Sequence, residues 1–132
     1  MIYWLIGILL VISGISKSVK DTVRDHYYGS IFSKLNQKYW NGTNSWLNKY
    51  DQTKFPDLKP KFWGSTTFLA WTTDAWHLFD TIQSTCLQLA ISIPISILLG
   101  NLWLVLPVIA LTKILVGVPF EITYSKLFVK KK

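Results

Sequence analysis

Three apolar blocks dominate the pattern of hydrophobic and polar positions along the chain. Charged residues are absent from positions 1–16, 81–112 and 114–120, and the middle block alone is longer than a bilayer requires. A helix that crosses lipid satisfies its own backbone hydrogen bonds. The pattern therefore predicts an all-α membrane protein with three transmembrane helices, at about 2–20, 78–99 and 102–118, and an aromatic-rich interfacial loop between the first two.

The first block is short for a span, since a helix rises only about 1.5 Å per residue. We therefore expect this helix to continue past Lys17 and Lys20, whose long side chains can reach back to the interface. Apolar residues recur at every fourth position from 15 to 31, which supports the continuation. Gly29 is the predicted end of the helix.

The second apolar block predicts a long helix that begins well before the bilayer. Residues 65–67, Ser-Thr-Thr, offer N-cap chemistry, and nothing interrupts a helix from there to Gly100 and Asn101. Its first part, through about His77, is expected to protrude or to lie in the interface, and Pro94 permits a kink. Gly100-Asn101 predicts a tight turn, and Pro119 is expected to close the third span.

The segment at about 30–64 differs in composition from its neighbours and is rich in polar and aromatic residues. One short amphipathic helix is predicted before Asn41, and loop after it. We expect this segment to lie along the lipid headgroups, with its lysines facing anionic lipid. The aromatic residues that favour this position are Tyr39, Trp40, Trp46, Tyr50, Phe55, Phe62 and Trp63.

The distribution of charge predicts the orientation in the membrane. The 132-residue chain, long enough for one domain, carries a net charge of +7; nine of its fourteen lysines and arginines lie within 17–61 and four more within a basic tail at 126–132. The positive-inside rule places both clusters on the cytoplasmic side and the N-terminus outside. Nucleic acid is an unlikely partner because no groove or stacking platform is evident. Cys86, the single cysteine, reads as a packing residue.

Most ionisable groups on the predicted helices fall at one depth, the cytoplasmic mouth of the bundle. One hypothesis is that His26 and His77 bind a divalent metal together with Asp74, Asp80 or Glu121. Such a metal would activate water against a lipid ester or phosphate. The corresponding acid and base candidates are Asp74, His77, His26 and Asp25.

The alternative hypothesis is that these charges neutralise one another. On that view His77 donates a hydrogen bond to a carbonyl or carboxylate in ordinary packing, and no HExxH, CxxC or GxSxG pattern argues otherwise. We favour this alternative. The groups expected to pair are Lys17, Asp21, Arg24, Asp25 and Glu121.

A polar stripe marks one side of the second predicted helix. It recurs at spacings of three and four and is expected to face protein or a cavity, since unsatisfied polar groups are costly in lipid. Lys113, on the third helix, is expected to reach toward the interface or to bond Gln88. The members of the stripe are Asp74, His77, Thr81, Ser84, Gln88 and Ser92.

Two sequence elements resemble a known group of proteins. The elements SWLNKY at 45–50 and TDAWHL at 73–78 resemble those of uncharacterised small integral membrane proteins of Bacteroidetes-type bacteria and their phages. The resemblance covers about the middle third of the chain and implies a bacterial inner-membrane setting without supplying an activity. It also implies that the loop folds back onto the start of the second span and groups Trp46, Asn48, Lys49, Tyr50, Asp74, Trp76 and His77.

These features predict a non-enzymatic accessory protein or complex subunit of the inner membrane. It would dock a protein partner, or a second copy of itself, through the basic aromatic loop, with Trp46, Asn48, Lys49, Tyr50 and Trp76 as the docking candidates. One alternative is a metal-assisted enzyme embedded in the membrane and acting on a lipid-type substrate. A second alternative is an oligomeric channel or membrane-perturbing protein.

Overall fold

Three long helices form the body of the molecule. The computed structural model describes residues 2–54 and 57–123, with the side chains of 120 and 121 outside the described part. The helices are α1 (Ile2–Asp25), α4 (Ala75–Leu98) and α5 (Val105–Ile122). Three stretches, Ile2–Asp25, Ala75–Leu98 and Leu102–Pro119, are long and apolar enough to cross a membrane. The predicted all-α, three-span, multi-pass architecture is confirmed.

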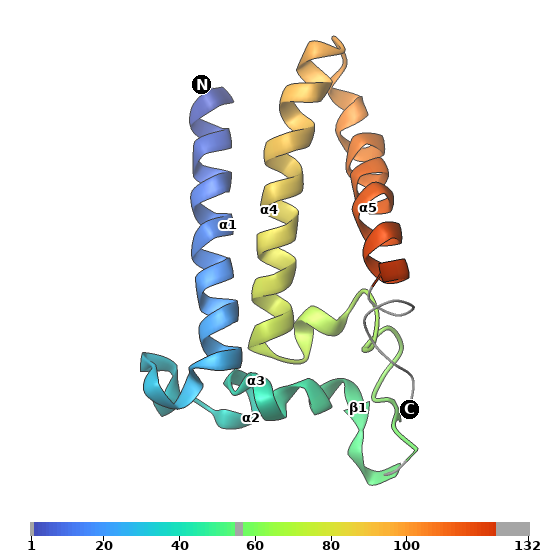
Figure 1. Ribbon diagram of the computed structural model, residues 1–132. Helices are drawn as coiled ribbons and strands as arrows, with labels where there is room; N and C mark the ends of the chain where they lie inside the picture. Colours follow the sequence, from blue (N-terminus) through green and yellow to red (C-terminus); the bar gives the residue numbers. More distant parts are fainter. Residues whose placement is uncertain (1, 55–56, 124–132) are drawn as a thin grey trace.

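Short elements gather at one end of the three helices. Figure 1 shows them beneath α1 and α4, while the N-terminus and the turn between α4 and α5 lie at the other end. The described residues of 27–73 are called the platform below. Its elements are η1 (Tyr27–Gly29), η2 (Ile31–Lys34), α2 (Gln37–Trp40), α3 (Gly42–Ser45), η3 (Trp46–Lys49), β1 (Tyr50–Asp51), η4 (Gln52–Lys54), β2 (Lys59–Pro60) and η5 (Ala70–Thr72). Strands β1 and β2 pair antiparallel, Tyr50 opposite Pro60, and η6 (Leu102–Leu104) precedes α5.

The expectation of one short helix followed by loop is wrong for this segment. Ser30, Asn36 and Asn41 each accept a hydrogen bond from a backbone N–H two residues on. Each side chain therefore starts a new helical turn, since it satisfies a donor that an isolated turn leaves open. The repetition of these cap residues at short spacing is the sequence signal for successive short turns.

Helix α1 ends four residues before the predicted stop at Gly29. His26 leaves the helical conformation, and Tyr27 turns inward until its side chain is almost fully buried. The Tyr27 hydroxyl donates to the carbonyl oxygen of Leu35 at 3.0 Å. Burial of this ring with its hydroxyl satisfied competes with a further helical turn, and it holds the turn after α1 against the rest of the platform.

The start of α4 also differs from the prediction. Asp74, and not the 65–67 segment, is the N-cap, so the helix begins at Ala75. Ser65 is fully buried instead, and its hydroxyl donates to the carbonyl oxygen of Lys49 at 2.7 Å. The cap chemistry at 65–67 therefore joins two parts of the platform. At the other end of the fold, Pro119 lies inside α5 and does not close it.

Helix α4 packs closely on α1 along its length. Small side chains, Ser13 and Ser16 on α1 and Ala90 on α4, are buried and permit close approach of the helices. The Ser13 hydroxyl donates to the carbonyl oxygen of Gln83 at 3.1 Å. Below this contact, the start of α3 presses on α1, since a Cβ at Gly42 would lie 3.0 Å from the Arg24 Cα. Two helices and the platform therefore form one packed unit.

The predicted polar stripe of α4 is only partly buried. Asp74 and Ser92 are buried, but Thr81 and Ser84 are exposed on the outer side of the helix. The Ser84 hydroxyl donates to the Thr81 carbonyl oxygen at 3.1 Å, so it is satisfied by its own helix. A hydroxyl of this kind can face lipid, and the expectation of one continuous protein-facing stripe is wrong. Lys113 is exposed on α5 and has no hydrogen-bond or ion-pair partner within the described residues.

Candidate functional site

The Asp74 and His77 side chains form a hydrogen-bonded pair at the start of α4. Asp74 is fully buried, and its Oδ1 accepts the backbone N–H of His77 at 3.0 Å. Its Oδ2 lies 2.7 Å from His77 Nδ1 and 2.9 Å from the Thr73 hydroxyl. A carboxylate acceptor on Nδ1 places the ring proton there and leaves Nε2 as the free nitrogen. Asp74 thus both caps the helix and orients the imidazole.

The platform closes over this pair from one side. Asn48 donates from Nδ2 to the carbonyl oxygens of Lys38 and, at 3.1 Å, of Thr73, the residue before the cap. Burial raises the pKa of the Tyr39 hydroxyl, and the negative charge of Asp74 raises it further. The platform is therefore folded back onto the start of α4, as the resemblance implied.

A small pocket of about 230 Å³ opens between the end of α1, the platform and the start of α4. We call it the junction pocket, and it contains three of the five predicted docking residues. The other two lie beside it: Asn48 holds Thr73, and the Tyr50 ring meets the Trp46 ring edge-on at 6.1 Å. The pocket is lined by Arg24, Gly42, Trp46, Lys49, Trp76 and His77.

The other predicted site residues belong to separate ion pairs. Lys20 Nζ on α1 lies 2.9 Å from Asp80 Oδ1 on α4, and Lys17 pairs with Asp21 within α1. Arg24 binds Asp25 through two hydrogen bonds of 2.9 Å. The Lys17–Asp21 and Arg24–Asp25 pairs match the charge-neutralisation hypothesis. The Lys20–Asp80 pair was not part of that hypothesis, and the Glu121 side chain lies outside the described residues.

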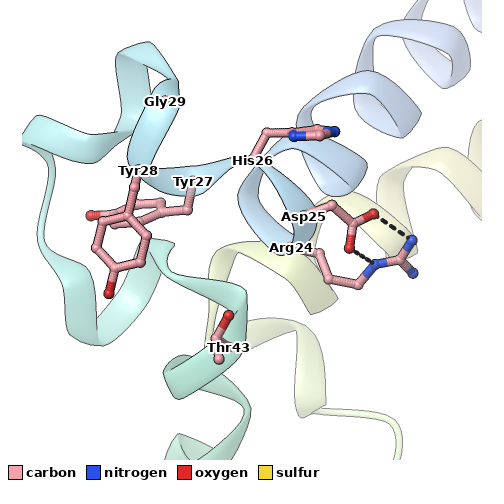
Figure 2. Close-up of a pocket in the computed structure, with 7 residues that line it drawn as sticks. All are labelled: Arg24, Asp25, His26, Tyr27, Tyr28, Gly29 and Thr43. Atoms are coloured by element: carbon pink, nitrogen blue, oxygen red, sulfur yellow. Dashed lines mark hydrogen bonds and ion pairs between the residues drawn. The ribbon is translucent and has the colours of Figure 1, made fainter.

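The two histidines do not share a cavity. His26 lines a second cavity of about 510 Å³. Figure 2 shows Tyr27 and Tyr28 across from the Arg24–Asp25 pair at this cavity. His77 lines the junction pocket, and Arg24 is the residue common to both cavities. Among the described residues, no three His, Cys, Asp or Glu side chains come together as metal ligands would. The geometry does not support the predicted ligand set of His26, His77, Asp74 and Asp80.

The Asp74–His77 pair could accept a proton or a hydrogen bond through Nε2. Nucleophilic catalysis would further require a hydroxyl or thiol bonded to that nitrogen, and no such bond exists within the described part of the chain. The hydroxyl of Ser45 in α3 is buried without a hydrogen-bond partner, yet it does not reach the imidazole. The arrangement is better suited to binding than to covalent chemistry.

Sequence reasoning missed two residues of the junction pocket. Gly42 was not among the predicted site residues and Arg24 was predicted only to neutralise neighbouring charges, whereas both line the pocket beside His77. The available signal was depth, because Arg24 lies near the end of the first span while Trp76 and His77 lie near the start of the second.

Comparison with known proteins supplies no relative from which a function could be transferred. No protein-family model, no curated protein and no solved structure matches the chain. The resemblance to the small bacterial and phage membrane proteins therefore stays a prediction. Functional assignment depends on the geometry of the described residues.

Proposed function

We propose that this protein is a non-enzymatic accessory subunit of the bacterial inner membrane that docks a protein partner through its platform. The observation that carries the proposal is an exposed aromatic pair on a backbone that is held by buried contacts. The rings of Trp63 and Phe68 meet edge-on at 4.9 Å, although the two side chains are 81% and 58% exposed. Aromatic anchors held in place before binding are typical of the energetic centres of protein interfaces.

The backbone that carries this pair is held by buried contacts. Gly64 adopts a positive φ of 80°, and an added Cβ would lie 3.0 Å from the Phe68 ring. Next to it, the buried Ser65 hydroxyl bonds the Lys49 carbonyl oxygen, which also accepts the Lys61 N–H at 3.0 Å. These contacts join the turn to η3 and, through Asn48, to the start of α4. A partner that binds the pair would therefore be coupled to the membrane helices.

The orientation in the membrane belongs to the same proposal. The platform and the basic tail lie on the cytoplasmic side, with the N-terminus outside, because the lysines and arginines concentrate there. The end of the molecule that carries the α4–α5 turn would then face outward (Figure 1). The metal-assisted enzyme and the oligomeric channel remain predictions that no specific observation favours.

Photo-crosslinking in living cells tests the docking role. A photoreactive phenylalanine at Trp63 should give a discrete protein adduct, and the adduct should disappear when Phe68→Ala is added. The matched control is the same group at Trp103, which is 86% exposed in η6, at the end of the molecule away from the platform. It should give no such adduct. Lipid adducts alone at position 63 would show that the aromatic pair enters the membrane interface, and the docking proposal would be wrong.

A further inference from the structure

The junction pocket lies where the two packed membrane helices meet the platform. Arg24 is in the last turn of the candidate span Ile2–Asp25, and His77 is in the first turn of the candidate span Ala75–Leu98. With both candidate spans in a bilayer, these two helix ends bring the pocket near the boundary of the hydrocarbon layer. Phosphate groups of phospholipids occupy that depth.

The pocket has an excess of positive charge. Lys49 has no ion-pair partner within the described residues, and its Nζ lies 5.4 Å from the centre of the Tyr50 ring. Arg24 uses Nε and one Nη2 hydrogen for Asp25, so three of its five N–H donors remain free. No carboxylate lines the pocket. Arg24 from α1 and Lys49 from η3 both line the pocket, and an arginine together with a lysine is typical of phosphate recognition.

One further polar atom at the pocket has no partner. His77 Nδ1 is bonded to Asp74, and His77 Nε2 makes no hydrogen bond within the described residues. A ligand group could therefore bind this nitrogen without breaking an existing contact.

The helix N-terminus itself is not the anion site. The Asp74 carboxylate already accepts the His77 backbone N–H and caps α4. The ligand would instead meet side chains from α1, η3 and α4, which converge only in the folded structure. The volume of about 230 Å³ is below the roughly 300–1,000 Å³ of pockets that enclose a whole ligand, so it suits a headgroup and not an entire lipid.

We propose that the junction pocket binds the headgroup of one anionic phospholipid. Arg24 and Lys49 contact the phosphate, and His77 Nε2 accepts a hydrogen bond from a headgroup hydroxyl, as in phosphatidylglycerol. Three of the predicted docking candidates, Trp46, Lys49 and Trp76, line this site, but the Trp63–Phe68 pair does not. The lipid proposal can therefore be tested separately from the docking proposal.

Native mass spectrometry of the purified protein in detergent tests the proposal. Phosphatidylglycerol should remain bound at one molecule per chain, with about tenfold higher affinity than phosphatidylcholine. The Arg24→Gln, Lys49→Gln variant should lose this preference. A matched variant, Lys34→Gln with Lys59→Gln, removes the same charge from exposed platform positions outside the pocket and should keep it.

One further measurement protects the conclusion. Inorganic phosphate in large excess should not displace the lipid. Equal binding of both lipids by the wild type, or a preference lost equally in the Lys34/Lys59 variant, would overturn the site. Displacement by inorganic phosphate would overturn the lipid as its ligand.

Discussion

The α1–α4 contact and the α4–α5 contact are built differently. Between α1 and α4 there are small buried side chains, a hydrogen bond from Ser13 to a backbone carbonyl and the Lys20–Asp80 ion pair. Helix α5 lies along the other side of α4 (Figure 1), and the described side chains of Val105–Ile122 make no hydrogen bond to another helix. In that stretch even Thr112 bonds its own helix, at the Ile109 carbonyl oxygen.

This difference indicates which part of the molecule is specified by polar contacts. Hydrophobic burial does not distinguish helix faces in lipid, because the lipid tails are as apolar as the side chains. Polar contacts and close packing must therefore fix the geometry of α1, α4 and the platform. Helix α5 is held to α4 mainly by the short connection at Gly100, whose φ is +71°, and by apolar contact. Substitutions in the first unit should consequently cost much more than those in α5.

The largest effect is expected at Asp74. Asp74→Ala removes the helix cap, leaves the His77 backbone N–H without its acceptor and frees the imidazole, and should destabilise the protein by about 2–4 kcal/mol. Thermal unfolding in detergent and abundance in cells would both report this loss. Asp74→Asn is the control, since asparagine also caps helices, and it should cost only about 1 kcal/mol. Unchanged abundance with Asp74→Ala would mean that the pair is not structural and would reopen the catalytic hypothesis.

A smaller effect is expected at the ion pair between the helices. Lys20 is only 15% exposed, so Asp80→Asn leaves a poorly solvated ammonium without its counter-charge and should cost about 1–3 kcal/mol. The exchange variant, Lys20→Asp with Asp80→Lys, should recover much of that stability. A double-mutant cycle measures the coupling between the two positions. Additive losses would show that the pair does not hold α1 to α4.

The smallest effects are expected for single hydroxyl groups, one in the α1–α4 contact and one in α5. Ser13→Ala removes a hydrogen bond from α1 to α4 and should cost about 0.6 kcal/mol. Thr112→Val removes a hydrogen bond within α5 and should change the free energy of unfolding by less than about 0.5 kcal/mol. Equal losses in the two variants, measured by the same unfolding assay, would contradict the distinction between the contacts.

The structure brings two of the predicted site residues, Asp74 and His77, together and places His26 and Asp80 elsewhere. Asp74 and His77 are three residues apart on one helix, so their proximity followed from helical geometry. His26 and Asp80 were predicted to lie at the same depth as this pair. Depth along the helix axis does not determine which face of the helix a side chain lies on. Asp80 faces Lys20 on α1, whereas His26 follows the end of α1 and lines a different cavity.

The sequence by itself determined the three spans, the turn at Gly100-Asn101 and the ends at which polar groups gather, because lipid requires continuous apolar helices. It left open how the platform folds and which side chains meet there. That was decided by long-range contacts, from Asn48 to Thr73 and from Ser65 to Lys49, which no local pattern encodes. The junction pocket exists only because those contacts bring η3 against the ends of two different spans.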